Sequence, residues 1–219
     1  MENITGIILA GGKSQRMGTD KGLLLLRGKP FVTHIYEALK PIVGDNIMVV
    51  SSNADYDALG YNRIEDMIAD KGPVGGLYTA LKQSKTKFNL VLSVDVPLVS
   101  TELLQWLVTK HEDSFMVTQV QAQDKASPLI AVYDRSTRIL LGEHLAGNQL
   151  KLRDVIAEVN HQTLEVPSKW SKQVQNINTE EDYKKIQHWC HRHYTLSAHF
   201  EVPQARCGAC DGGWKDHQV

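Results

Sequence analysis

Short apolar runs alternate with longer segments of helical periodicity over most of this chain. The runs are rich in Val, Ile and Leu, which is typical of strands buried on both faces of a parallel sheet. They are residues 6–10, 46–50, 88–94, 115–120 and 128–133. Alternation of strands and helices favours an α/β fold with a mostly parallel sheet.

The intervening segments carry apolar residues at the spacing of an amphipathic helix. The expected helices are residues 30–39, 77–83, 101–110 and 135–145, a short helix opening near residues 147–153, and a last helix from Thr179 through Trp189. Pro30 suits a first helical turn, and Pro41 with Gly44 is expected to end that helix. Residues 63–66 form a short apolar-acidic segment, and residues 163–166 and 174–177 are expected to be late strands.

Length and charge narrow the functional classes. The chain has 219 residues and a formal net charge of -1, which suits one sizeable domain and gives no bulk attraction to nucleic acid. No apolar stretch is long enough to span a membrane, and the N-terminus lacks the pattern of a secretory signal. The three cysteines all come late and give the main domain no disulfide framework. We therefore expect a cytoplasmic protein that binds neither nucleic acid nor a membrane.

The most informative stretch is the loop at residues 9–21, which directly follows the first apolar run. Gly11 and Gly12 let the backbone turn tightly and approach a ligand, and Lys13, Arg16 and Lys21 bring three cations together. This combination favours a polyphosphate, because backbone N–H groups cradle the oxygens and cations neutralise their charge. The alternative is an ordinary glycine turn with solvated lysines. The loop matches neither common nucleotide fingerprint, which argues against P-loop NTPases and dinucleotide dehydrogenases.

A carboxylate ends the clearest central strand. Asp95 follows the run at 88–94, and a strand-end carboxylate facing a phosphate loop suits Mg²⁺, which is often held by one or two carboxylates plus substrate phosphates. The alternative is a helix cap, but Ser100 is better placed to cap the next helix.

Two strings of residues resemble a known family. Leu-Ala-Gly-Gly-Lys-Ser-Gln-Arg-Met-Gly at 9–18 and Asp-Lys-Gly-Leu-Leu at 20–24 resemble the signature of nucleotidyltransferases with a glycosyltransferase-A-like, Rossmann-related fold of three layers. Within that superfamily, the chain is most similar to the molybdenum cofactor guanylyltransferases. The resemblance covers roughly residues 1–190 and implies transfer of GMP from GTP to the terminal phosphate of molybdenum-molybdopterin, with release of pyrophosphate.

The resemblance also implies site residues. Lys21, Arg16 and Asp95 would be catalytic, with Asp95 holding Mg²⁺ and the two cations on the triphosphate. The implied GTP-binding set is Leu9, Ala10, Gly11, Gly12, Lys13, Lys21, Ser51, Asn53, Asp66, Gly72, Pro73, Gly76 and Asp95. Asp66 would accept hydrogen bonds from guanine. Asn53 and Asp66 also suit plain turns, and the glycines at 72–76 could serve only as a turn and a packing contact.

For the second substrate, the resemblance implies Asn178, Lys151 and Arg153, and Asn178 could alternatively position a metal-bound water. Lys151 and Arg153 could equally be solvated surface residues, and Thr179 with Asp182 fits a capping box. Ser127 stands where the family often has histidine. The implied partners are the two substrates, with transient contacts to molybdenum insertion proteins and molybdoenzyme chaperones.

Two other functions stay open at this point. One is a cytidylyltransferase of the same fold, acting on molybdopterin or on a sugar or polyol phosphate. The other is a non-catalytic nucleotide-binding module with a metal-binding tail. Residues 191–219 form a Cys/His-containing extension that we expect to be partly disordered. Its Cys207 and Cys210 could instead form half of a zinc site, completed by Cys190, His191 or His193.

Overall fold

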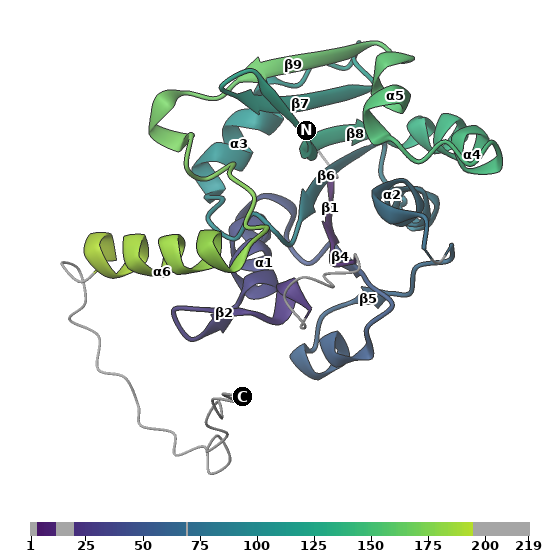
Figure 1. Ribbon diagram of the computed structural model, residues 1–219. Helices are drawn as coiled ribbons and strands as arrows, with labels where there is room; N and C mark the ends of the chain where they lie inside the picture. Colours follow the sequence, from purple (N-terminus) through teal and green to yellow (C-terminus); the bar gives the residue numbers. More distant parts are fainter. Residues whose placement is uncertain (1–3, 12–19, 69, 195–219) are drawn as a thin grey trace, which may run out of the picture.

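The architecture is a three-layer α/β sandwich around one seven-stranded sheet (Figure 1). The computed structural model describes residues 4–11, 20–68 and 70–194, with side chains as far as Cys190. The strand order is β5-β4-β1-β6-β8-β7-β9. The strands are β1 (Ile4–Leu9), β4 (Ile47–Val50), β5 (Arg63–Ile64), β6 (Phe88–Ser93), β7 (Val117–Ala122), β8 (Lys125–Asp134) and β9 (His161–Glu165). A separate two-stranded hairpin joins β2 (Leu25–Leu26) to β3 (Lys29–Pro30).

The sheet is mostly parallel, as the sequence predicted. Ile7 of β1 lies opposite Met48 of β4 and Val91 of β6, both in parallel register. Only β8 runs antiparallel to its neighbours β6 and β7. The carboxyl ends of β1, β4 and β6 therefore meet at one edge of the sheet, where open α/β sheets bind ligands.

Helices cover both faces of the sheet (Figure 1). One face packs against α1 (Phe31–Val43) and α3 (Thr101–Lys110), and the other against α2 (Gly72–Gln83), α4 (Arg138–Ala146) and α5 (Leu152–Ala157). Successive side chains along each strand point to opposite faces of the sheet and so pack into the two cores in turn. Ile8 belongs to the first apolar cluster, and Ile7 belongs to the second.

The last helix stands apart from the sandwich. α6 (Glu180–Tyr194) packs Ile186 and Cys190 against Leu26 and Phe31 in a third apolar cluster, beside the β2–β3 hairpin (Figure 1). Since α6 continues through Tyr194, it crosses the domain boundary expected after residue 190. The buried side chain of Cys190 faces this apolar cluster, while Cys207 and Cys210 lie outside the described residues.

Three sequence predictions need correction. Pro41 lies inside α1 and does not end it, because Ile42 and Val43 still pack on the first core. α2 starts at Gly72 and takes in the glycine cluster, five residues earlier than the start expected at residue 77. Residues 174–177 are not a strand: Val174 and Ile177 are buried in two different apolar clusters, so the backbone between them crosses from one to the other.

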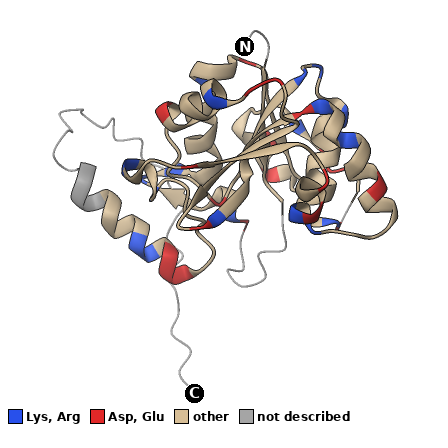
Figure 2. Cartoon of the chain, turned by 90° about the horizontal axis from the view of Figure 1, so that it is seen from above, with Lys and Arg blue, Asp and Glu red and all other residues tan. Residues whose placement is uncertain are grey.

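Acidic and basic residues are interspersed over the elements of the described chain, and α6 carries both signs (Figure 2). Within those residues, no helix combines the length and apolarity that crossing a membrane requires.

Candidate active site

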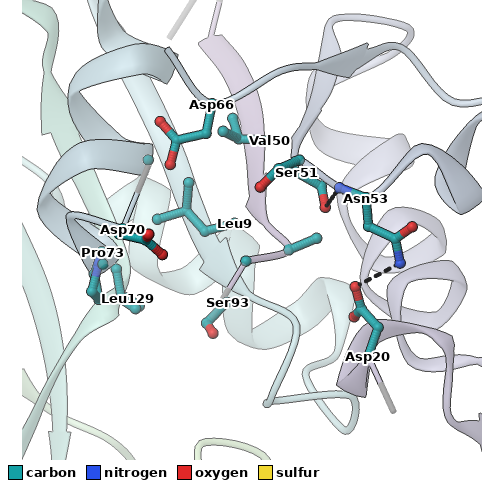
Figure 3. Close-up of a pocket in the computed structure, with 15 residues that line it drawn as sticks. Leu9, Asp20, Val50, Ser51, Asn53, Asp66, Asp70, Pro73, Ser93 and Leu129 are labelled. Carbon is teal, nitrogen blue, oxygen red and sulfur yellow. Dashed lines mark hydrogen bonds between the residues drawn. The ribbon is translucent and has the colours of Figure 1, made fainter. Parts of the chain in front are cut away.

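A cleft of about 530 Å³ opens at the carboxyl edge of the sheet (Figure 3). It lies where β1 and β4 end and α2 begins. Its walls are Leu9, Ala10, Gly11, Asp20, Val50, Ser51, Ser52, Asn53, Asp66, Asp70, Gly72, Pro73, Gly76, Ser93 and Leu129.

Most of the residues predicted to bind the nucleotide line this one cleft. They are Leu9, Ala10, Gly11, Ser51, Asn53, Asp66, Gly72, Pro73 and Gly76. Gly12, Lys13 and Arg16 lie outside the described residues. Lys21 and Asp95 do not belong to the cleft walls, and their surroundings are described below.

Asp66 stands at one end of the cleft with its two carboxylate oxygens in different surroundings. Oδ1 accepts hydrogen bonds from the buried Thr79 hydroxyl at 2.9 Å and from the backbone N–H of Ile68 at 3.1 Å. Thr79 itself accepts from Met67 N at 3.2 Å, so its hydroxyl hydrogen is directed to Asp66. No hydrogen bond within the described chain reaches Oδ2, so this oxygen can accept from a ligand in the cleft.

The first turns of α2 leave space around that carboxylate. A Cβ at Gly75 would lie 3.0 Å from the Ile68 carbonyl oxygen, a distance that real Cβ atoms rarely tolerate. A Cβ at Gly76 would sit 3.9 Å from Asp66 Oδ2. Glycine at these positions therefore allows close packing of the helix and keeps the carboxylate open to the cleft.

Asp20, on the opposite side of the cleft from Asp66 (Figure 3), was given no role by the sequence. Its Oδ1 accepts from Gly22 N at 3.0 Å and from the Tyr56 hydroxyl at 2.6 Å, and its Oδ2 accepts from Asn53 Nδ2 at 3.1 Å. Burial and the hydrogen bond to Asp20 raise the pKa of Tyr56, so its hydroxyl stays protonated as a donor at neutral pH. No pattern around Tyr56 revealed this contact, because it joins residues 36 positions apart.

Lys21 and Asn178 meet, although 157 positions separate them in the sequence. Lys21 Nζ donates to Asn178 Oδ1 at 2.7 Å. Asn178 is the last residue but one before α6, and its backbone N–H donates to Asp182 Oδ2 at 3.1 Å. The predicted phosphate-binding lysine and the predicted second-substrate residue thus belong to one constellation.

The closing segment at residues 176–178 also holds Asp95. Asn176 Nδ2 donates to Asp95 Oδ2 at 2.9 Å, and Ile177 N donates to the Asp95 carbonyl at 2.8 Å. Asp95 Oδ1 is buried and has no hydrogen-bond partner within the described residues. A buried carboxylate oxygen without a donor fits a cation as its partner. The described residues contain no cluster of three or more such ligands, so a cation here would take its other ligands from substrate and water.

A second hollow of about 310 Å³ adjoins the closing segment and includes Asn176, the partner of Asp95. Its walls are Ala122, Gln123, Lys125, Ser127, Ser171, Val174, Gln175, Asn176 and Asp182. Its walls come from the β7–β8 hairpin, from residues 171–176 and from the first turn of α6.

Lys151 and Arg153 lie apart from these groups. Lys151 is exposed at the start of α5. Arg153 lines a third hollow of about 330 Å³ together with Gln119, Lys125 and His161. The loop before them is tied to the cleft wall, because Lys71 Nζ at the start of α2 donates to Asn148 Oδ1 at 2.9 Å.

Comparisons with known proteins now add to this geometry. Residues 6–164 match the family model described as the MobA-like NTP transferase domain. A protein of Flavobacterium johnsoniae named "Probable molybdenum cofactor guanylyltransferase" is 42% identical over 186 residues, covering 85% of this chain and 97% of that protein. The Yersinia pestis protein named "Molybdenum cofactor guanylyltransferase" is 31% identical, covering 82% of this chain and 93% of that protein.

Solved structures agree on the fold. A crystal structure named molybdopterin-guanine dinucleotide biosynthesis protein A, from Archaeoglobus fulgidus, superposes with a TM-score of 0.74 at 22% identity, covering 86% of this chain and 99% of that one. A protein from Aquifex aeolicus superposes with a TM-score of 0.71 at 26% identity, covering 80% of this chain and 94% of that one. Both likenesses cover at least 80% of this chain.

Proposed function

The chain belongs to the MobA-like NTP transferase family, and from this premise we propose that it transfers GMP from GTP to the terminal phosphate of molybdenum-molybdopterin. The product is the molybdopterin guanine dinucleotide form of the cofactor, with pyrophosphate released. The observation that carries the proposal is a nucleotide-sized cleft into which Asp66 presents a carboxylate oxygen that no other described residue hydrogen-bonds, in a chain 42% identical to a relative that bears this name.

The reaction is a displacement at phosphorus. An oxygen of the terminal phosphate of molybdopterin forms a bond to the α-phosphorus of GTP. The bond from that phosphorus to the bridging oxygen breaks, and this oxygen keeps the electron pair and leaves in pyrophosphate. The attacking oxygen is already ionised at neutral pH, so the site must supply positioning and charge neutralisation more than proton transfer.

Asp66 supplies the choice of base. Guanine presents two neighbouring N–H donors on its Watson–Crick edge, and the free Asp66 Oδ2 is an acceptor. Cytosine presents an acceptor nitrogen at the corresponding place, which would face the carboxylate without a hydrogen. A base that leaves a buried polar group unpaired is rejected more strongly than one that only fits poorly.

Lys21 supplies positive charge to the triphosphate. Its hydrogen bond to Asn178 holds the ammonium group near the closing segment, where the acceptor must approach. Lys13 and Arg16 belong to the same loop and would add to this charge. A lysine that is positioned before the reaction stabilises charge on the leaving pyrophosphate without reorganising.

Asp95 is the residue that would hold Mg²⁺, through its buried Oδ1, which has no hydrogen-bond partner among the described residues. When bound, this ion would neutralise phosphate charge and orient the phosphate oxygens. Asn176 keeps the other carboxylate oxygen occupied, so Asp95 would offer the metal a single oxygen in a fixed direction.

For molybdopterin, the hollow beside Asn176 offers a binding surface next to Asp95. Lys125 gives it a cation, and Ser127 and Gln175 give it neutral polar groups. Asn178 would face the acceptor phosphate from the neighbouring position. Lys151 and Arg153 would bind more distant parts of that substrate.

The test is pyrophosphate release by the purified protein with Mg²⁺ and molybdopterin, in parallel reactions with GTP and CTP. Release with GTP and not with CTP is the expected result. Release with CTP alone would overturn the assigned base and make the protein a cytidylyltransferase. Binding of GTP without any release, despite intact molybdopterin, would identify a binding module.

A further inference from the structure

Asp20 accepts more hydrogen bonds from the described residues than Asp66, the carboxylate at the other end of the cleft. It accepts from three donors on three different segments: Gly22 N, Tyr56 Oη and Asn53 Nδ2. The bond from Tyr56, at 2.6 Å, is short and charge-assisted. These three donors compensate the negative charge of Asp20, which would otherwise repel a triphosphate bound nearby.

Tyr56 is fixed in place. Its side chain is 0% exposed and packs in the first apolar cluster with residues of α1 and the sheet. Its hydroxyl is therefore a donor whose position is set by the core. Asp20 is joined through this hydroxyl to the close-packed first apolar cluster.

Asn53 is fixed as well. Its Oδ1 accepts from Asp55 N at 3.0 Å, which leaves the amide nitrogen to face Asp20 Oδ2. Its own backbone N–H donates to Ser51 Oγ at 3.1 Å, directly after β4. The orientation of the Asn53 amide is thus set by contacts that do not involve Asp20.

Gly22 makes this arrangement sterically possible. A Cβ at position 22 would lie 2.1 Å from the Tyr56 hydroxyl oxygen and 3.1 Å from Val94 Cγ1. Any larger residue would push the tyrosine away from Asp20. Lys21 stands between the two anchored residues, in the single turn Lys21–Leu23 that Asp20 caps.

We propose that Asp20, Asn53 and Tyr56 form a positioning clamp, in which Asp20 acts as an anchor for the turn that carries Lys21 and not as a metal ligand or base. The inference rests on the proposed function for its turnover measurements. The clamp holds Lys21 against Asn178 before GTP arrives, while the base is recognised independently at the Asp66 end. Loss of the clamp should therefore lower kcat and leave GTP affinity nearly unchanged.

The first test removes the hydroxyl donor of Tyr56. Tyr56→Phe removes only the hydroxyl, and we expect kcat to fall about 10- to 100-fold because a misplaced catalytic group is costly, with the Kd for GTP within about threefold of wild type. Tyr61→Phe is the matched control, since it removes a hydroxyl that donates to Thr33 Oγ1 at 3.0 Å outside the cleft. Thermal unfolding of both variants separates the effect from loss of fold. A Tyr56→Phe enzyme with normal kcat overturns the proposal.

The second test exchanges the hydrogen-bond acceptor at position 20 with the donor at position 53. Asp20→Asn would set its amide nitrogen against the fixed Asn53 amide nitrogen, so kcat should fall by about 10-fold or more. Adding Asn53→Asp restores an acceptor opposite that amide. Recovery of kcat to within about threefold of wild type is expected for an anchor. A double variant no more active than Asp20→Asn would show that the charge is needed at position 20 itself and would overturn the proposal.

A third measurement is independent of turnover. The Gly22 amide hydrogen should be protected from exchange in the wild-type protein and lose protection in Tyr56→Phe, but not in Tyr61→Phe. If wild-type protein shows this pattern but releases no pyrophosphate, the proposed function fails and the clamp stands. Unchanged protection in Tyr56→Phe counts against the clamp whatever the activity.

Discussion

Asp66 illustrates how a side chain can be fixed by the fold through one oxygen and present its other oxygen to a cleft. Thr79 and the Ile68 amide hold Oδ1, and Oδ2 is left open to the cleft. The sequence identified Asp66 by resemblance but did not reveal Thr79, which lies 13 positions away on the buried side of α2. Such partners are set by tertiary packing, so no local pattern could have named them.

Asp66→Asn should shift the preference of the enzyme from GTP toward XTP. The hydrogen bonds to Oδ1 keep the amide oxygen inward, which turns the amide nitrogen toward the guanine donors. We expect kcat/KM for GTP to fall about 10- to 100-fold, since a hydrogen bond to a charged group contributes about 1.5–3 kcal/mol. Turnover with XTP, which carries a carbonyl in place of the guanine amino group, should rise relative to GTP.

The matched control is Glu65→Gln, which removes the charge of an exposed neighbour and should leave both nucleotides unaffected. Unchanged discrimination between GTP and XTP in Asp66→Asn would remove Asp66 from base recognition.

Lys21→Ala should lower the transfer rate about 100-fold or more, because a charged group positioned at the triphosphate is lost. The melting temperature should change little, since the only hydrogen bond that Lys21 Nζ makes in the described chain joins it to the exposed Asn178 side chain. Steady-state pyrophosphate release measures the first effect and calorimetry the second.

Lys29→Ala removes an exposed lysine that pairs with Glu37 at 2.7 Å, and its turnover should match wild type. Normal turnover in Lys21→Ala would contradict the phosphate assignment.

At the scale of elements, the central strands were predictable because they are continuous apolar runs buried on both faces of the sheet. The helices α1 and α3 were predictable because their apolar periodicity matches the faces that they bury, although α1 continues beyond its expected end. Ser100 caps α3, accepting from Leu103 N at 3.3 Å, as expected. The glycine cluster was harder to assign, since glycines rarely open a helix. At Gly75 the preceding backbone packs so closely that a Cβ would lie 3.0 Å from the Ile68 carbonyl oxygen. The prediction of a strand at residues 174–177 was wrong because two apolar residues can be buried without any strand pairing.

The start of α6 couples a helix cap to the site. Thr179 Oγ1 accepts from Asp182 N at 3.1 Å, and Asp182 Oδ2 accepts from Thr179 N at 3.0 Å. The side-chain hydrogen bond with Thr179 lowers the pKa of Asp182, so its carboxylate stays ionised at neutral pH. This reciprocal pair is the predicted capping box.

Thr179→Ala should destabilise the protein by about 1 kcal/mol, the usual cost of losing an N-cap. It should also lower kcat several-fold, because Asn178 shares the Asp182 carboxylate. Urea unfolding and turnover measure the two effects, and Thr179→Ser should restore both. Full activity in Thr179→Ala would separate the cap from the site.

At the scale of the whole molecule, the two cores close over the sheet and bury a few titratable groups. His111 lies at the end of α3, 6% exposed, with its ring 4.6 Å from that of Phe88. Its Nδ1 contacts Thr118 Oγ1 at 2.8 Å. Burial lowers the pKa of His111, against the opposing effect of Asp113 and Asp134. The lowered pKa of His111 could not be predicted from the sequence, because no local pattern distinguishes the buried ones among the nine histidines.

The depressed pKa of His111 has a definite consequence for stability. The unfolded chain takes up a proton near the ordinary histidine pKa of about 6.5, while the folded protein resists it. The free energy of unfolding should therefore be highest above pH 6.5, where both states are neutral at His111, and it should decrease as the pH is lowered below that value. Urea titrations over this range should show a smaller loss for His111→Leu. An identical pH dependence in the two proteins would contradict the assignment.

The closing segment ties the end of the chain back to residues 81 and 157 positions earlier, through Asn176 to Asp95 and Asn178 to Lys21. On the ribosome, the sheet strands that bear Asp95 emerge well before these partners do. Domains fold as units during synthesis, and contacts between distant positions form late. The contacts of Asn176 and Asn178 with Asp95 and Lys21 therefore cannot form until residues 176–178 have left the exit tunnel, so a growing chain completes its reaction centre only after that point.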